Sequence, residues 1–223
     1  MKRFKNIASK LGILVFGCSY IILVCLAMSS AKTKTELINF EKDEDIDNNI
    51  IVVHFIHGSI PKEDCSYQKK RLGGYLGGHI EIEVNNFVYG FLYDTLPMNY
   101  IPKSTFNSKF EKRGFEVWNE LIANDKITSI EIPTDKKQTK ELEILLNKYW
   151  NKAPYDYSFL GQRCASSTAK ILSDIGIINK FSNQESIIAF YYPKLLRRTM
   201  IKYAEKNNYK IKNKSGIDCH NWE

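Results

Sequence analysis

Residues 77–93, GGHIEIEVNNFVYGFLY, hold two candidate strands joined by a turn. In residues 79–84, isoleucine and valine alternate strictly with histidine and glutamate, which is the period of a strand with one buried face. Asn85 and Asn86 are typical of a two-residue hairpin turn, and the aromatic run at residues 87–93 is typical of the returning strand. The stretch therefore predicts an antiparallel hairpin.

Strands and helices on both sides of this hairpin follow from the same patterns. The runs at residues 49–57 (NIIVVHFIH) and 127–132 (ITSIEI) predict two more strands. Helices are expected to begin after Thr134 or Asp135, near Cys164 and at Pro193, with a short one near residues 116–122 inside a surface excursion at residues 95–126. Together these elements predict an α+β domain in which an antiparallel sheet packs against helices.

The N-terminal part of the chain indicates export. Four basic residues lie ahead of residues 11–28, an uncharged apolar run (LGILVFGCSYIILVCLAM) whose length fits a long signal peptide or a short membrane helix. Residues 1–31 are therefore expected to be a signal peptide, cleaved near the small residues 29–31, or a membrane anchor. Lipidation at Cys18 is the weaker alternative. The rest of the chain is expected to be membrane-anchored, periplasmic or extracellular.

Beyond this segment, the interpretation is a polar linker at residues 32–48, one domain at residues 49–210 and a basic tail at residues 211–223. The net charge of +7 falls to +3 when the four basic residues ahead of the apolar run are removed. The other lysines are scattered among acidic residues rather than gathered in a stripe. Binding to nucleic acid is therefore not expected.

Three cysteines fall in the part expected to be exported: Cys65, Cys164 and Cys219. An odd number permits at most one disulfide within the chain, so at least one thiol stays free or pairs elsewhere. Cys65 and Cys219 are a candidate pair, which the sequence leaves open. No two cysteines have the spacing of metal ligands such as CxxC, so a cysteine metal site is not expected.

Cys164 stands where a reactive thiol is expected, at the start of a predicted helix. Unpaired N–H groups at a helix N-terminus favour the thiolate, and the pKa of such a thiol falls from about 8.5 to roughly 3.5–7.5. Thiolate attack on a carbonyl needs an imidazole to protonate the leaving group. His79 follows two glycines at the start of a strand, whereas His54 and His57 lie in an apolar strand and His220 in the tail. Cys164 and His79 are therefore a chemically coherent pair.

Three further residues are candidates for the substrate or oxyanion site: Gly78, Tyr155 and Gln162. Gly78 allows close approach of backbone or substrate. Tyr155 either lines the cleft or positions the loop before Cys164. Gln162 either offers an amide donor to an oxyanion or faces water.

Two segments resemble a known family. Residues 153–172, APYDYSFLGQRCASSTAKIL, are similar to the cysteine motif of the permuted NlpC-like papain-fold hydrolases, and residues 78–82, GHIEI, match their histidine strand. The branch that the chain resembles is the YiiX group, related to the lecithin:retinol acyltransferase-like proteins. The resemblance covers roughly residues 49–198 and implies a circularly permuted papain-like fold, in which the histidine precedes the cysteine along the chain.

The resemblance implies that Cys164 is the nucleophile, that His79 is the general base and acid, and that the Cys164 N–H group belongs to an oxyanion hole. It implies no metal or organic cofactor. The family usually places a third, polar residue on the strand after the histidine, where this chain has Tyr89, Gly90 and Phe91. Glu81, on the same strand face as His79, or Asp94, at the end of the returning strand, could take that role.

The leading hypothesis is an exported cysteine hydrolase that cleaves an amide or ester bond of a cell-envelope peptide or lipid, held at the membrane by its N-terminal segment. One alternative is a catalytically inactive binding module on the envelope surface that keeps a papain-like groove. The other is an acyltransferase that acts on membrane lipid.

Overall fold

The expected hairpin is formed by strands β3 (Gly78–Val84) and β4 (Phe87–Tyr93) of the computed structural model, which describes residues 49–65, 72 and 77–223. Asn85 and Asn86 both have positive φ angles, of 51° and 63°. A two-residue hairpin turn with this backbone matches the twist of the strands that it joins. The prediction of the hairpin and of its turn is confirmed.

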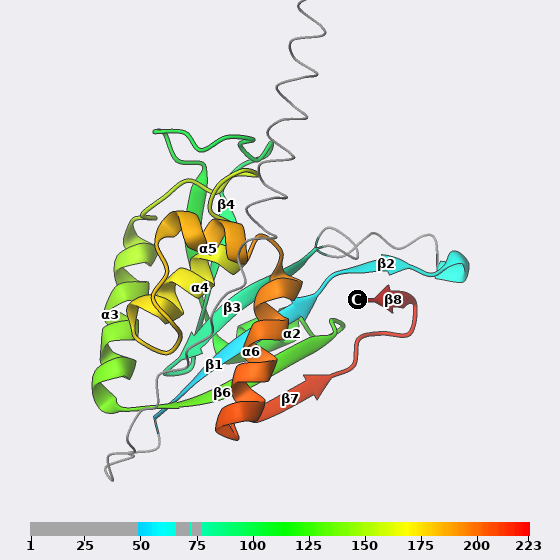
Figure 1. Cartoon of the computed structure of the whole chain (residues 1–223). Coiled ribbons are helices and arrows are strands. Elements are labelled where there is room, and N and C mark those ends of the chain that lie inside the picture. The colour runs from blue at the N-terminus through cyan, green and yellow to red at the C-terminus, as the bar shows by residue number, and fades with distance from the viewer. Residues whose placement is uncertain (1–48, 66–71, 73–76) are drawn as a thin grey trace, which may run out of the picture. The chain divides into compact units, whose positions relative to one another are not determined.

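β3 and β4 belong to a six-stranded antiparallel sheet (Figure 1). β1 (Asn49–His57) lies inside the sheet between β3 and β6 (Ile127–Thr134), as its mainly apolar, β-branched sequence favours. The edges are β5 (Ser108–Gly114), which pairs with β4, and β7 (Lys210–Lys214), which pairs with β6.

Four helices cover one face of the sheet or pack against helices that do. Figure 1 shows α4, α5 and α6 in front of the strands and α3 at the left of the view. The four are α3 (Lys136–Asn151), α4 (Cys164–Asp174), α5 (Asn183–Ala189) and α6 (Pro193–Asn207). The main core lies between these helices and the inward residues of the sheet, which include Phe55, Ile80, Ile82, Leu142, Leu172 and Leu196. A smaller apolar cluster on the opposite face joins the sheet to Trp118 of α2 (Phe115–Leu121).

Local signals in the sequence explain where these helices begin. The Asp135 carboxylate accepts a hydrogen bond from the Gln138 N–H at 2.6 Å and so caps α3, and Pro193 is the first residue of α6. α4 begins at Cys164, as expected. It is followed by Gly176, whose φ of +74° suits the end of a helix.

The prediction of a basic tail at residues 211–223 is wrong, because these residues belong to the domain. Ile211 packs against the main core, and Lys210 and Lys212 of β7 pair with Glu131 of β6. Further on, β8 (His220–Trp222) pairs with β2 (Ser59–Pro61). A disulfide joins Cys219 to Cys65 at the end of the short 3-10 helix η1 (Glu63–Cys65), which resolves the candidate pairing that the sequence left open.

The expected N-terminal segment and linker, residues 1–48, lie outside the described residues. Within the part of the chain that the structure describes, no helix is long and apolar enough to cross a membrane. The short helix expected near residues 116–122 is confirmed as α2, but β5 just before it was not expected.

Candidate active site

β3 and α4 bring the two candidate catalytic side chains together. Cys164 is the first residue of α4, and His79 is the second residue of β3, against which α4 packs. The thiol and the imidazole lie within hydrogen-bonding reach of each other. Both are buried, with 3% of Cys164 and 7% of His79 exposed. Among the described residues, Cys164 is the free cysteine.

The surroundings of Cys164 favour its thiolate. Burial alone would raise the pKa of the thiol, but the charge of His79 and the hydrogen bond from its ring outweigh burial and lower that pKa. The Arg163 guanidinium and the Ile80 backbone N–H act in the same direction.

The pKa of His79 moves in the opposite sense. Burial would lower it, but the Cys164 thiolate, helped by Glu81, outweighs burial and raises it. A lowered thiol pKa beside a raised imidazole pKa favours the thiolate–imidazolium pair, which is the reactive form of a thiol nucleophile.

Glu81 lies on the other side of the imidazole. Its Oε1 is 3.7 Å from His79 Nε2, so the remaining ring nitrogen, Nδ1, is left to face the thiol. The carboxylate is 3% exposed; it accepts a short hydrogen bond from Trp118 Nε1 and lies 3.6 Å from the Arg113 guanidinium. Asp94, the other candidate for this role, is exposed and pairs with Lys109 at 3.4 Å. Of the two, the geometry favours Glu81.

Gly90 provides the space that Glu81 occupies. It lies directly opposite Glu81 in the β3–β4 ladder. A Cβ atom at residue 90 would lie 2.6 Å from Glu81 Oε1 and 3.1 Å from His79 Nε2, closer than van der Waals contact allows. A glycine at this position therefore leaves room for the Glu81 carboxylate beside the imidazole.

Tyr157 and Arg163 also reach the thiol, and neither was among the expected site residues. The Tyr157 hydroxyl lies within hydrogen-bonding reach of Cys164 and of Arg163. Burial, with the charge of Cys164, raises the pKa of Tyr157, so its hydroxyl stays protonated and can donate. The Arg163 guanidinium lies over the Tyr191 ring, 4.7 Å from its centre. The signal in the sequence was the position of both residues in the segment that leads to Cys164.

The three residues expected at the substrate or oxyanion site are placed differently. The Tyr155 hydroxyl is 2.6 Å from Ser167 Oγ of α4 and its ring packs on Phe91, so this tyrosine positions the helix. Gln162 is buried, and its amide donates to α5 at 3.3 Å. Gly78 has a φ of +115°, and a Cβ atom there would lie 2.8 Å from the Ile56 carbonyl oxygen. Gly78 therefore shapes the backbone before His79.

A cavity of about 210 Å³ reaches the imidazole from the α2 side of the sheet. It is lined by His79 and Glu81, by Arg113, and by an apolar wall that includes Ile56, Leu92, Leu121 and Ile122. Cys164 does not line it. His79 therefore lies between the buried thiol, on α4, and a mainly apolar cavity beside α2.

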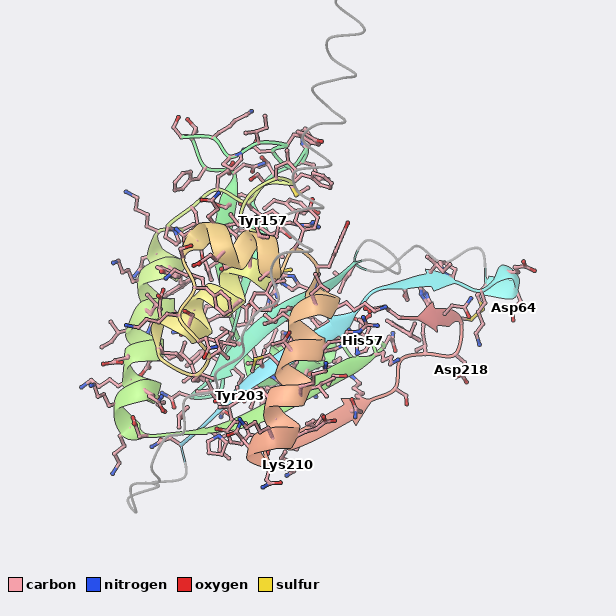
Figure 2. The ribbon with its side chains drawn as sticks, in the orientation of Figure 1. His57, Asp64, Tyr157, Tyr203, Lys210 and Asp218 are labelled. Carbon is pink, nitrogen blue, oxygen red and sulfur yellow. A yellow bond between two sulfur atoms is a disulfide. The ribbon has the colours of Figure 1, made fainter. Side chains whose placement is uncertain are left out.

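His57 makes its contacts away from Cys164. His57 Nε2 is 3.0 Å from the Thr128 hydroxyl and its Nδ1 is 2.8 Å from a Glu223 oxygen, and burial lowers its pKa to about 4, so it stays neutral. Figure 2 shows His57 well away from Tyr157, which marks the thiol end of the domain. In the described ranges no group of histidine, cysteine and acidic side chains has the arrangement of a metal site.

Comparison with known proteins adds no relative: no family model, no curated protein and no solved structure matches the chain.

Proposed function

We propose that this chain is an exported cysteine hydrolase of the permuted NlpC-like papain type, which cleaves an amide or ester bond in cell-envelope material. The observation that carries the proposal is the juxtaposition of Cys164 with His79 at the start of a helix, with Glu81 on the far side of the imidazole. The order of these groups along the chain, histidine before cysteine, agrees with the resemblance on which the family assignment rests. The N-terminal apolar run would hold the domain at the membrane.

The proposed reaction begins with attack of the Cys164 thiolate on the carbonyl carbon. The carbonyl oxygen becomes an oxyanion, which the backbone N–H groups at the start of α4 and the protonated Tyr157 hydroxyl are placed to stabilise. The His79 imidazolium then gives its proton to the leaving amine or alcohol, and a thioester remains on Cys164. Neutral His79 next removes a proton from water, and the hydroxide that forms releases the acid and regenerates the thiolate.

In this scheme Glu81 stabilises the imidazolium and holds the ring in place, with Trp118 and Arg113 fixing the carboxylate in turn. The 3.7 Å separation of Glu81 from His79 Nε2 is longer than a hydrogen bond, and among the described residues that nitrogen has no hydrogen-bond partner. Catalytic contacts of this kind are often long in a free enzyme and tighten when substrate binds.

The pH dependence of alkylation tests the ion pair. Because the thiol pKa is lowered and the imidazole pKa is raised, Cys164 is expected to react with iodoacetamide at an almost constant rate from neutral pH down to the lowered thiol pKa. At pH 6 an ordinary thiol is only about 0.3% ionised, so a thiol with a lowered pKa has a much larger thiolate fraction. A low-pKa thiolate is a weaker nucleophile, which offsets part of the rate increase from this larger fraction. Cys164 should therefore react about tenfold faster than in the unfolded chain.

The rate is measured on the full chain by peptide mass spectrometry, which separates Cys164 from the other cysteines. His79→Gln is the matched variant, and it should return the pH profile to that of an ordinary thiol. A native profile that rises only above pH 8 would exclude the ion pair and, with it, the hydrolase.

The apolar cavity beside His79 favours a second candidate function, an acyltransferase or esterase that acts on membrane lipid. Five aliphatic side chains of the described part of its wall suit a hydrocarbon chain better than a polar peptide. Incubation of the full chain with phospholipid vesicles should then leave a fatty acyl group on Cys164, detected by mass, and none on Cys164→Ala. Cleavage of peptide amides with no acyl adduct from the vesicles would instead support the envelope-peptide substrate.

A further inference from the structure

We propose that Ser129, His54 and Glu83 form a second nucleophilic site, able to hydrolyse small carboxylic esters. The three residues lie on three adjacent strands, β6, β1 and β3. His54 Nδ1 is 2.8 Å from Ser129 Oγ, and His54 Nε2 is 2.9 Å from Glu83 Oε2. A serine hydroxyl bonded to one nitrogen of an imidazole, with a carboxylate on the other, is the arrangement that activates serine for attack on a carbonyl.

The strand register produces this arrangement. His54 and Ser129 are directly opposite each other in the β1–β6 ladder, and Glu83 lies on the α2 face of β3, diagonally across from His54. The imidazole is held from above by α2, since the Trp118 ring centre is 4.3 Å from that of His54. His54 is 4% exposed, so its orientation is fixed by packing as well as by its two polar partners.

A separate cavity of about 220 Å³ opens over these residues. All three line it, as do apolar side chains of α2 and β6, including Phe115 and Ile127. The polar lining includes Asn119 of α2 and Lys212, which is opposite Ser129 in the β6–β7 ladder. The site thus combines a nucleophile, a base, an orienting carboxylate and an apolar wall, and the Asn119 amide in the lining is the candidate donor to an oxyanion, since Lys212 already pairs with Glu131.

The reaction balances with water as the only co-reactant. Ser129 Oγ bonds to the ester carbonyl carbon while its proton passes to His54 Nδ1, and the imidazolium gives that proton to the departing alcohol. Water, deprotonated by His54, then cleaves the acyl–serine ester and releases the carboxylic acid. The cavity volume is below the range of drug-sized pockets, and its walls are mainly apolar, so the substrates are esters with a short aliphatic acyl group.

The test uses the full chain carrying Cys164→Ala, so that no adduct forms on that thiol. The probe is an alkyl fluorophosphonate, with adducts located by peptide mass spectrometry, and p-nitrophenyl butyrate hydrolysis is followed in parallel. We expect an adduct on Ser129, loss of the adduct and of hydrolysis in Ser129→Ala, and at least about a tenfold slower reaction in Glu83→Gln, because the imidazole then lacks its carboxylate partner.

Ser59 provides the control within the same chain. Its hydroxyl is also bonded to a histidine, 2.6 Å from His220 Nδ1, but Ser59 is fully buried and lines neither cavity. No adduct is expected there, and Ser59→Ala should leave the reaction at Ser129 unchanged. A folded Cys164→Ala chain with no adduct on Ser129, or with equal adducts on both serines, would show that the cluster only satisfies the buried imidazole. That result would leave the Cys164 hydrolase untouched, because the two sites share no nucleophile.

Discussion

Replacing Gly90 by alanine is expected to slow the acylation of Cys164 by about a hundredfold, the size of effect that an ångström-scale misplacement of a catalytic group can produce. The new Cβ atom would lie 2.6 Å from Glu81 Oε1 and 3.1 Å from His79 Nε2, so the carboxylate, the imidazole or both must move. The nearest atom is the end of a side chain rather than backbone, so the chain should still fold. The rate is measured with a p-nitrophenyl ester, and the acyl group is located on Cys164 by mass.

Gly114→Ala is the matched control. Gly114 lies at the end of β5, opposite Phe87 of β4, and a Cβ atom there meets nothing within 4 Å. This variant should acylate at the native rate. If Gly90→Ala did the same, Glu81 would have no part in orienting His79, and the proposed catalytic group would reduce to Cys164 and His79.

Replacing Cys65 and Cys219 together by serine is expected to lower the free energy of unfolding by about 3–5 kcal/mol. The disulfide joins residues 154 positions apart, and closing a loop of this length removes roughly 5 kcal/mol of chain entropy from the unfolded state. For a domain of this size the melting temperature should fall by about 10 °C. The hydrogen bonds between β2 and β8 are expected to loosen first, because the disulfide connects their ends.

A reducing agent supplies the comparison for this variant. The native chain should lose a similar amount of stability when reduced, whereas the double serine variant should melt at the same temperature with and without reductant. A native chain whose melting is unaffected by reductant, with the disulfide shown to be broken, would mean that the residual contacts of β8 suffice to hold it.

The sequence predicted those elements whose structure follows from a local pattern of apolar and polar residues. Alternation before Asn85 and Asn86 predicted the β3–β4 hairpin, and the mainly apolar, β-branched sequence of β1 predicted a buried strand. β5 and β7 were not predicted because they are edge strands rich in lysine. Each strand adds little apolar surface to the main core: β5 contributes Phe110, and β7 contributes Ile211. Both strands therefore depend on pairing with a neighbouring strand.

In the candidate site, likewise, residues with a local signal in the sequence were predicted, and residues positioned by tertiary packing were not. Cys164 was placed by a local signal, the start of a helix, and His79 by its position beside two glycines. The groups that fix Glu81 could not be predicted, since Trp118 and Arg113 reach it only through the β4–β5 pairing and the packing of α2. Gln162 was misplaced because a loop residue near the thiol in sequence points instead towards α5.

One strand, β3, carries the base of the first proposed site, His79, and the orienting carboxylate of the second, Glu83. His79, Glu81 and Glu83 succeed one another on the same side of β3, and Trp118 lines the cavities over both. Any substitution along this strand that tilts its backbone will therefore disturb two chemistries at once. Variants of residues 164 and 129, which stand on separate elements, are the ones that can assign an observed activity to a single centre.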